Sequence, residues 1–380
     1  MPKFGSCFII AVAMMAGLFC EEAFAGMWRF GFYWSLTATS YPPSAVPWQK
    51  YTHVSQFGLR PNAGCGIDDQ SYNAGSTKAD FVKTAHANHV LALVTMVHDP
   101  SATNMIKCTG RNNIAGFVSA IVNYVNTNSY DGFDLDWETN VPADQYMDLV
   151  RRLRAAMPSK LLTTDIAIHQ RGYVVPVQAQ LDRINLMNYD MYGSDYRGKP
   201  IKGTWHHVAL ASGNDNLNRK SVEANLYYAL GSRLDPAKIN LGLPFYGYAF
   251  EGCELGSKTP SKCMAPLIGP NQSISSEGQK ATQVAYSKIV SAYAGAKQVW
   301  DPVHKTSYVV CAAPQCMPPS FVSFMSPQEA KEAVNFAIAK NLGGIMTFAL
   351  HQEYMPGQSG DARYPLSSTI YNALAQKGKL

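Results

Sequence analysis

The sequence predicts an α/β protein built on a (β/α)8 TIM barrel, with a small α+β insertion between strands 7 and 8. Three observations support this fold class. Short β-branched or apolar runs recur eight times, amphipathic segments separate them, and one stretch rich in Gly, Pro, Ser and Lys interrupts the alternation. Eight βα units in about 250 residues are typical of a closed parallel barrel, whose functional side chains lie at the carboxyl ends of the strands.

The predicted strands follow one another at residues 29–34, 53–59, 90–97, 130–138, 161–168, 184–189, 239–246 and 342–350. Between them, apolar residues recur at helical spacing, first at Phe117, Ile121, Tyr124 and Val125, then at Tyr146, Leu149, Leu153 and Met157. A further helix is predicted to begin at Ser326, which can cap it, with Pro327 in its first position and Glu329 closing a capping box. Gly343 and Gly344 end that helix and begin the last strand.

The interrupting stretch, residues 251–319, is interpreted as an inserted subdomain. It contains a predicted helix at 281–293 and strand-like pieces around Val299 and at 307–310. The barrel would then comprise residues 26–250 and 320–380.

Residues 1–25 have the pattern of a cleaved secretory signal. Lys3 precedes an apolar stretch at 8–19, and small residues flank a cleavage position near Ala25. About twelve apolar residues are too few for a membrane anchor, which needs about twenty. A lipoprotein site at Cys20 is a weaker alternative because the small pair that precedes such cysteines is missing. We therefore expect a secreted protein without a membrane partner.

The six cysteines beyond the signal predict disulfides, because an even number in an exported chain is typical of them. Fifteen pairings are possible for six cysteines, and loop closure favours near neighbours. The expected pairs are Cys65 with Cys108, Cys253 with Cys263, and Cys311 with Cys316. A metal site is the poorer alternative, since no pair has CxxC spacing and no histidine lies at a matching offset.

Composition and motifs exclude several classes of function. Hydrophobic residues make up 47% of the chain and charged residues 16%, which fits a globular protein with a sizeable core. The net charge of +5 is spread along the chain, so no nucleic-acid partner is expected. No Rossmann, Walker A, HExxH or GxSxG motif is present, and no cofactor is expected. We expect a monomer.

The largest concentration of titratable side chains lies in the segment DGFDLDWE, residues 131–138, at the end of the fourth predicted strand. Side chains alternate faces along a strand, so Asp134, Asp136 and Glu138 would face the barrel axis while Trp137 would face the helices. Three such close carboxyls should titrate as a coupled set, with at least one protonated near neutral pH. A calcium or magnesium site is the competing use of stacked carboxylates, but no further acidic loop follows in register, so no metal is expected.

This segment resembles the signature of the glycoside hydrolase family 18 chitinases. Other stretches resemble the same family in order and spacing: MNYD at 187–190, LGLPFYGYAF at 241–250, WDPVHKTSYVV at 300–310 and LGGIMTFAL at 342–350. The resemblance covers nearly all of the mature chain and implies a secreted retaining chitinase that hydrolyses β-1,4-linked N-acetylglucosamine in chitin or its oligosaccharides.

The resemblance also implies the roles of individual residues. Glu138 would be the general acid, and the acetamido carbonyl of the sugar would attack its own anomeric carbon. Asp136 would accept the acetamido N–H, Asp134 would share a proton with it, and Tyr189 would hydrogen-bond the acetamido oxygen. The substrate-binding residues expected from the resemblance are Asp131, Trp137, Met187, Asp190, Tyr246, Phe348 and Tyr33.

Departures from the family pattern keep alternatives open. The third strand lacks the usual SxGG. Phe348 stands where a tryptophan normally forms the floor of the cleavage subsite. Tyr248 stands where an arginine often follows the glycine of the seventh strand. An endo-β-N-acetylglucosaminidase or a cell-wall glycan hydrolase of the same family therefore remains an alternative. A catalytically weak chitin-binding lectin on this fold is another. The pairs His206-His207 and His98-Asp99 could be ligands or a base, but adjacent histidines on a loop are more often solvated, and no function is expected of either pair.

Overall fold

The computed structural model describes residues 26–69, 76–192, 203–213, 220–251, 269–271, 281–312, 315–316 and 320–380. The predicted signal, residues 1–25, and the predicted pair of Cys253 with Cys263 lie outside these residues.

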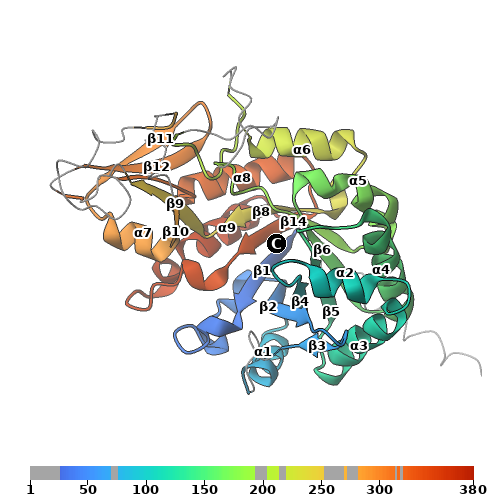
Figure 1. Cartoon of the computed structure of the whole chain (residues 1–380). Helices are drawn as coiled ribbons and strands as arrows, with labels where there is room; N and C mark the ends of the chain where they lie inside the picture. The colour runs from blue at the N-terminus through green and yellow to red at the C-terminus, as the bar shows by residue number, and fades with distance from the viewer. Residues whose placement is uncertain are drawn as a thin grey trace, which may run out of the picture.

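Within the described residues, eight parallel strands close into a barrel, which confirms the predicted (β/α)8 fold (Figure 1). Their order around the barrel is β1-β14-β8-β7-β6-β5-β4-β2, and β2 pairs with β1 to close it. A short strand, β3 (Ile67–Asp68), adds to the end of β2 in antiparallel fashion. The barrel strands are β1 (Trp28–Trp34), β2 (His53–Pro61), β4 (Leu91–Val97), β5 (Gly132–Asp136), β6 (Leu161–Ile166), β7 (Arg183–Leu186), β8 (Ile239–Pro244) and β14 (Gly344–Phe348).

Five strands, β5, β6, β7, β8 and β14, end two or three residues earlier than predicted, and the ends of β5 and β7 bear on the predicted site. The pairing of β5 with β4 ends at Asp136, which lies opposite Val97, so Glu138 follows the strand instead of belonging to it. β7 ends at Leu186, and Tyr189 and Asp190 lie in the turn beyond it. These predicted site residues therefore lie beyond the strands, at the opening of the barrel.

Helices cover the outside of the barrel, and the two predicted amphipathic segments lie in α3 and α4. Their predicted apolar positions, such as Phe117 and Leu149, are fully buried against the strands. The helices are α1 (Ser76–Ala87), α2 (Thr103–Thr109), α3 (Ile114–Thr127), α4 (Ala143–Ala156), α5 (Arg171–Val174), α6 (Val222–Gly231), α7 (Tyr286–Ala292), α8 (Pro327–Ala339) and α9 (Pro365–Gln376).

Helix α8 begins as predicted. Ser326 Oγ accepts a hydrogen bond from the Glu329 N–H at 3.2 Å. The backbone of Ser326 in turn interacts with the Glu329 carboxylate and opposes the rise in its pKa that burial causes. The carboxylate also accepts from Ser307 N at 3.0 Å and Thr306 Oγ1 at 3.2 Å, because α8 packs against the inserted sheet and these donors are buried there. Glu329 therefore joins the barrel to the insertion.

The inserted unit is a five-stranded antiparallel sheet with α7, and it projects to the left of the barrel in Figure 1. Its order is β10 (Thr282–Ala285), β9 (Tyr246–Glu251), β13 (Ser320–Phe324), β12 (Thr306–Cys311) and β11 (Lys297–Asp301). The predicted helix at 281–293 is wrong in its first turn, since residues 282–285 pair with β9 as a strand. The boundaries 251 and 319 lie within the span of this sheet, and the division into two domains stays a prediction.

Two disulfides of the predicted set are present. Cys65 with Cys108 joins the β2–β3 turn to α2, and Cys311 with Cys316 closes a short loop after β12. Among the described residues, every helix is too short or too polar to cross a bilayer.

The interior of the barrel differs from side to side. Apolar side chains, including Phe30 and Phe32 of β1 and Met346 of β14, fill one side. Serine, threonine, asparagine and aspartate side chains from β2 and β4 to β8 fill the other side, and they are buried as well. A larger apolar core lies between the barrel and its helices. The polar and titratable side chains of the barrel interior therefore lie beside apolar, largely aromatic ones.

Candidate active site

The carboxyls of the segment 131–138 alternate in the structure as their strand predicts. Asp134 is fully buried inside the barrel and Asp136 nearly so, while Glu138 is exposed at the mouth. Phe133 and Leu135 point outward and belong to the core under the helices. The three acids therefore form a column that rises from the barrel interior to solvent.

Asp134 is the most constrained member of this column. Its Oδ2 accepts from Thr95 Oγ1 at 3.0 Å, and its Oδ1 accepts from Thr163 Oγ1, with Asn185 Nδ2 at 3.5 Å. Burial raises the pKa of Asp134, and hydrogen bonds from Asp165 and the threonines oppose that rise. Asp134 is thus the acceptor of a buried network.

Asp165, on β6, forms the second half of this buried pair. Burial raises the pKa of Asp165 well above its usual range, and the charges of Asp134 and Asp136 raise it further. The hydrogen bond with Asp134 has the same effect, so the two carboxyls share a proton. The network continues sideways, since Asn240 Nδ2 donates to Asn185 Oδ1 at 2.8 Å.

Asp136 and Glu138 form the upper pair. Burial raises the pKa of Asp136 well above its usual range, followed by the charges of Glu138 and Asp134. Partial burial likewise raises the pKa of Glu138, where Asp190 adds to the rise, while His98 and the hydrogen bond from Asp136 oppose it. Each pair shares a proton, so the column carries less negative charge than four free carboxylates would. This state suits proton transfer better than the binding of a cation.

Asp190 lies at the rim of the same opening, held by residues from two other segments. Tyr246 Oη donates to Asp190 Oδ1 at 2.9 Å, and His207 Nδ1 lies 3.3 Å from the same oxygen. Burial opposes ionisation, but the hydrogen bonds from His207, Tyr246 and Tyr248 lower the pKa of Asp190. The Tyr189 ring packs edge-on against Tyr246, with centroids 6.0 Å apart. An ionised carboxylate and a buried tyrosine therefore lie across from the Asp136–Glu138 pair.

The part of the mouth at the ends of β1, β2 and β14 is lined by the rings of Phe32, Trp34, Phe57 and Phe348, called the aromatic wall below. The Phe348 ring lies 5.5 Å from Phe32 and 5.3 Å from Phe57, centroid to centroid. Trp34, at the end of β1, packs on Phe57 at 6.1 Å and on His351 at 5.8 Å. Flat apolar faces beside proton-sharing carboxyls are what a site for a sugar ring requires.

Residues 29–353 match the family model for glycosyl hydrolases family 18. The chain belongs to this family. Putative chitinase 2 of Margaritifera margaritifera is 24% identical over 287 residues, which are 70% of this chain and 57% of that protein, so this chain spans little more than half of that relative's length.

Two solved structures show the same fold. Catalytic domain 2 of the group II chitinase of Ostrinia furnacalis superposes with a TM-score of 0.73 at 21% identity, covering 92% of this chain and 97% of that one. Human YKL-39, described as a pseudo-chitinase with retained chitooligosaccharide binding, superposes with a TM-score of 0.73 at 16% identity, covering 92% of this chain and 100% of the other. The family 18 fold thus carries both enzymes and binding proteins, and activity has to be argued from the site.

The structure brings most of the predicted family 18 site residues together. Asp134, Asp136 and Glu138 form the column, Tyr189, Asp190 and Tyr246 form the facing rim, and Met187 and Phe348 are half-buried beside the apolar ring cluster of the barrel interior. Their chemical roles stay predictions.

Three predicted substrate-binding residues lie elsewhere, and the prediction is corrected for each. Asp131 precedes β5 at the opposite end of the barrel, where it pairs with His86 Nε2 and accepts from Ala92 N, both at 2.8 Å. Trp137 points outward into the helix-side core, fully buried, because it alternates with Asp136 and Glu138. Tyr33 also points outward, and its Oη donates to Tyr41 O at 3.1 Å.

The expectation that His206 and His207 are solvated is wrong, since both are fully buried. Their loop is covered by the inserted sheet, and His207 N donates to Ser323 Oγ at 2.7 Å. His98 is half-buried near Glu138, and the neighbouring Asp99 accepts from Asn104 N and Met105 N at the start of α2. Asp99 therefore stabilises the first turn of α2.

Sequence reasoning missed five residues of this region: Trp34, Phe57, Asp165, Asn185 and His207. The alternation along β1 contained a usable signal, because Phe30, Phe32 and Trp34 share one face. For Asp165 and Asn185 the same alternation along β6 and β7 was available, but no single strand shows that their partner is Asp134.

Proposed function

We propose that this chain is a secreted retaining chitinase, which hydrolyses β-1,4-linked N-acetylglucosamine with the acetamido group of the substrate as the nucleophile. One observation carries the proposal: the hydrogen-bonded pair of Asp136 and Glu138 opens to the barrel mouth directly above the buried pair of Asp134 and Asp165. A family 18 chain with an intact column of this kind has the parts for acid catalysis.

Glu138 would be the general acid. It is the exposed member of the column, and burial raises its pKa, which favours the protonated form that a general acid needs. That proton passes to the glycosidic oxygen as the bond to the anomeric carbon breaks. The electron pair of the broken bond leaves with the departing sugar, and the Glu138 carboxylate remains.

Asp136 and Tyr189 would hold the acetamido group that forms the new bond. Asp136 accepts the acetamido N–H and offsets the positive charge that develops on the ring, while Asp134 beneath it takes up the change in ionisation. Tyr189 would donate to the acetamido oxygen and orient its attack. Because the nucleophile belongs to the bound sugar, positioning supplies part of the rate.

The other carboxyls of the mouth are already engaged, which favours a nucleophile that belongs to the substrate. Among the described residues of the mouth, Asp190 is already bound by Tyr246 and His207, and Asp134 is buried among three donors. Neither stands ready to form a covalent glycosyl-enzyme. Retention would follow from two inversions, the first by the acetamido oxygen and the second by water.

The substrate class rests on the aromatic wall and on the relatives. Phe348 and Trp34 present rings of the kind that stack on sugars. The structure of a Cycas revoluta family 18 chitinase holds (GlcNAc)3, and an Ostrinia furnacalis domain was solved with an N-acetylglucosamine oligosaccharide. Secretion is supported by the two disulfides, which are typical of an oxidising compartment.

Activity on unactivated chitin oligomers of defined length tests the proposal. The wild-type chain should cleave them. Glu138→Gln should lower the rate by about 10² to 10⁴ while binding, measured by calorimetry, persists. Asp148→Asn, on the exposed face of α4, is the matched control and should behave as wild type.

Two outcomes would decide for the alternatives. Binding of the oligomers without cleavage by the wild type would indicate a chitin-binding lectin, as in YKL-39. Cleavage of a high-mannose glycopeptide or of peptidoglycan in preference to chitin oligomers would indicate the other polymers, an outcome that Phe348 and the missing SxGG favour. Near-normal turnover by Glu138→Gln would remove Glu138 from the acid role.

A further inference from the structure

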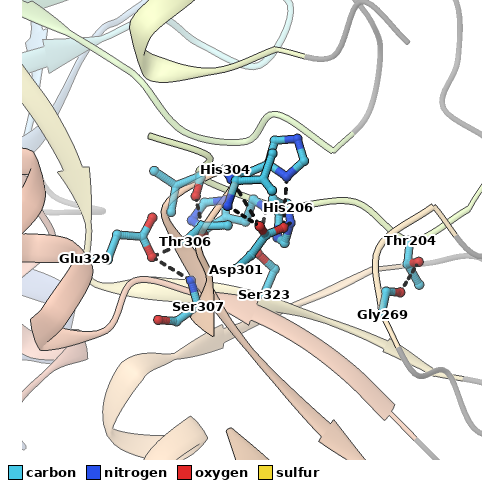
Figure 2. Close-up of polar contacts among 12 residues, drawn as sticks. Thr204, His206, Gly269, Asp301, His304, Thr306, Ser307, Ser323 and Glu329 are labelled. Atoms are coloured by element: carbon cyan, nitrogen blue, oxygen red, sulfur yellow. Dashed lines mark hydrogen bonds and ion pairs between the residues drawn. The ribbon is translucent and has the colours of Figure 1, made fainter. Parts of the chain in front are cut away.

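A second group of titratable side chains lies away from the carboxyl column, where the loop 203–213 meets the inserted sheet. His206 belongs to this loop, Asp301 is the last residue of β11, and His304 lies in the tight turn between β11 and β12. Figure 2 shows both imidazoles beside the Asp301 carboxylate. Among the described residues, this is the group of histidine, cysteine and acidic side chains whose ligand atoms converge, all within 4.8 Å of one another.

One carboxylate oxygen is the centre of the group. Asp301 Oδ2 lies 3.1 Å from His206 Nε2 and 2.9 Å from His304 Nδ1. The other oxygen, Oδ1, accepts from Val303 N at 2.9 Å and His304 N at 3.1 Å, which fixes the carboxylate in the turn. Oδ2 is therefore the oxygen presented to the two nitrogens.

The group is sheltered from solvent. The His206 side chain is fully buried, and the side chains of His304 and Asp301 are only 11% and 14% exposed. Trp205 packs on both imidazoles, with ring centroids 5.0 Å from His206 and 5.1 Å from His304. The surroundings thus hold two nitrogens and one oxygen close together in a nearly dry position.

We propose that His206, Asp301 and His304 bind one Zn²⁺ ion. Two imidazole nitrogens and one carboxylate oxygen are a ligand set that zinc prefers, whereas Mg²⁺ and Ca²⁺ take oxygen ligands. Zinc holds such atoms at about 2.0–2.2 Å, which places neighbouring ligands about 3.3 Å apart in a tetrahedron. The two measured N···O distances reach that spacing after shifts of a few tenths of an ångström.

The ion would join the loop 203–213 to the insertion. This junction already contains the hydrogen bonds of Ala211 N to His304 O at 3.0 Å and of Thr306 Oγ1 to Val208 O at 2.6 Å. The residue after His206 is His207, which reaches Asp190 at the rim of the barrel. Zinc at this junction would therefore be a structural ion that steadies the loop behind the rim, at a distance from the reacting atoms.

Calorimetric titration of the metal-stripped, tag-free protein with ZnCl₂ tests the proposal. We expect one Zn²⁺ per chain, and a rise in Tm when zinc is present. His304→Asn keeps a polar group beside Asp301 but loses the imidazole, and Asp301→Asn keeps the shape of the carboxylate. Loss of an outer-shell partner costs 10- to 100-fold in metal affinity, so loss of a direct ligand should cost at least about 100-fold.

His86→Gln is the matched control, because His86 also faces a carboxylate but without a third ligand atom in the described residues. It should bind zinc as the wild type does. Co²⁺ should give the visible absorption of a tetrahedral site in the wild type, and anomalous diffraction at the zinc edge should place the ion between the three side chains. These measurements need no substrate, so they are independent of the proposed hydrolase activity.

The proposal is overturned if the wild-type protein shows neither heat of binding nor a Co²⁺ band. It is also overturned if His304→Asn and Asp301→Asn bind zinc as tightly as the wild type, which would mean an adventitious ion elsewhere on the surface. Where a variant does not fold, the anomalous map of the wild type decides alone.

Discussion

Asp136 is the carboxyl through which the buried and the exposed halves of the column interact. Its own pKa is raised by burial and by the charges of Glu138 and Asp134, and its hydrogen bond lowers the pKa of Glu138. The general acid works only while it is protonated, so activity should fall as pH rises through the pKa of Glu138.

Asp136→Asn should lower kcat by about 10² to 10³, because a charge that stabilises the transition state is lost. It should also change the pH profile of kcat/KM, since the set of interacting carboxyls loses one titrating member. The pH profile of the variant beside that of Asp148→Asn checks this. An unchanged profile would show that the two carboxyls do not titrate together.

At the scale of single residues, the sequence predicted the column well and its supports poorly. Asp134, Asp136 and Glu138 follow from alternation along one strand, which is a local property. Asp165 and His207 act through contacts with other strands and with the insertion, and no local pattern contains those contacts. Trp137 was misassigned although its alternation with Asp136 already placed it on the outer face.

The segment between β5 and α4 determines the position and orientation of Glu138. Gln170 is fully buried beneath it, where Nε2 donates to Trp137 O at 2.8 Å and Oε1 accepts from Ala167 N at 2.8 Å. The backbone just before Glu138 is thereby anchored to the segment that follows β6. Gln170 is a positioning residue, since it touches no reacting atom.

Gln170→Leu should keep the volume but leave the buried Trp137 O and the part-buried Ala167 N without these partners, at about 1–3 kcal/mol for the buried group. We expect a lower Tm and a lower kcat with little change in KM, because the acid is displaced while the aromatic wall is unchanged. Gln178→Leu is the control, since Gln178 bonds Arg233 O and Asp235 N before β8, at the other end of the barrel. It should lower Tm without lowering kcat. Equal kcat losses in both variants would contradict the positioning role.

At the scale of elements, the centres of strands were predictable and their ends were not. Residues 282–285 have a pattern that fits the first turn of a helix, but the free edge of β9 recruits them as a strand. There a tertiary contact outweighs a local preference. Glu329 has the spacing of a capping box, and its carboxylate serves both the Ser326 backbone and the N–H of Ser307 in the inserted sheet, a contact that no local pattern contains.

A buried acid joins the last strand of the barrel to the last helix of the molecule. Glu353 follows β14 and is fully buried, where it accepts from Leu366 N at 2.6 Å and Ser367 N at 3.0 Å at the start of α9. Burial raises its pKa from 4.5 to about 7, against the opposing effect of these hydrogen bonds. The folded state therefore holds a proton that the unfolded chain releases between these pH values.

This proton makes the stability of the whole molecule depend on pH. The contribution is fully present below pH 4.5 and is lost as pH rises to 7, by about 3 kcal/mol. Glu353→Gln does not titrate, so the difference in free energy of unfolding between wild type and variant should change by that amount between pH 4.5 and 7. Chemical denaturation across this range measures it. Parallel curves for the two proteins would mean that Glu353 does not take up a proton on folding.

At the scale of the whole molecule, the barrel was predictable because its eight strands recur with a regular pattern of polarity. The near-neighbour cysteine pairs at 65 with 108 and 311 with 316 were also predictable. The packing of the inserted sheet over the loop 203–213 was not, since these segments are about a hundred residues apart. That packing buries His206 and His207.

The central claim is that this column of carboxyls lets the substrate supply its own nucleophile. Proton NMR of the first products from a chitin oligomer tests it most directly, before the anomers equilibrate. Retention through an internal nucleophile predicts that the new reducing end appears first as the β-anomer. Early α-anomer would mean that water attacks the anomeric carbon directly, which would contradict the proposed roles of Asp136 and Tyr189.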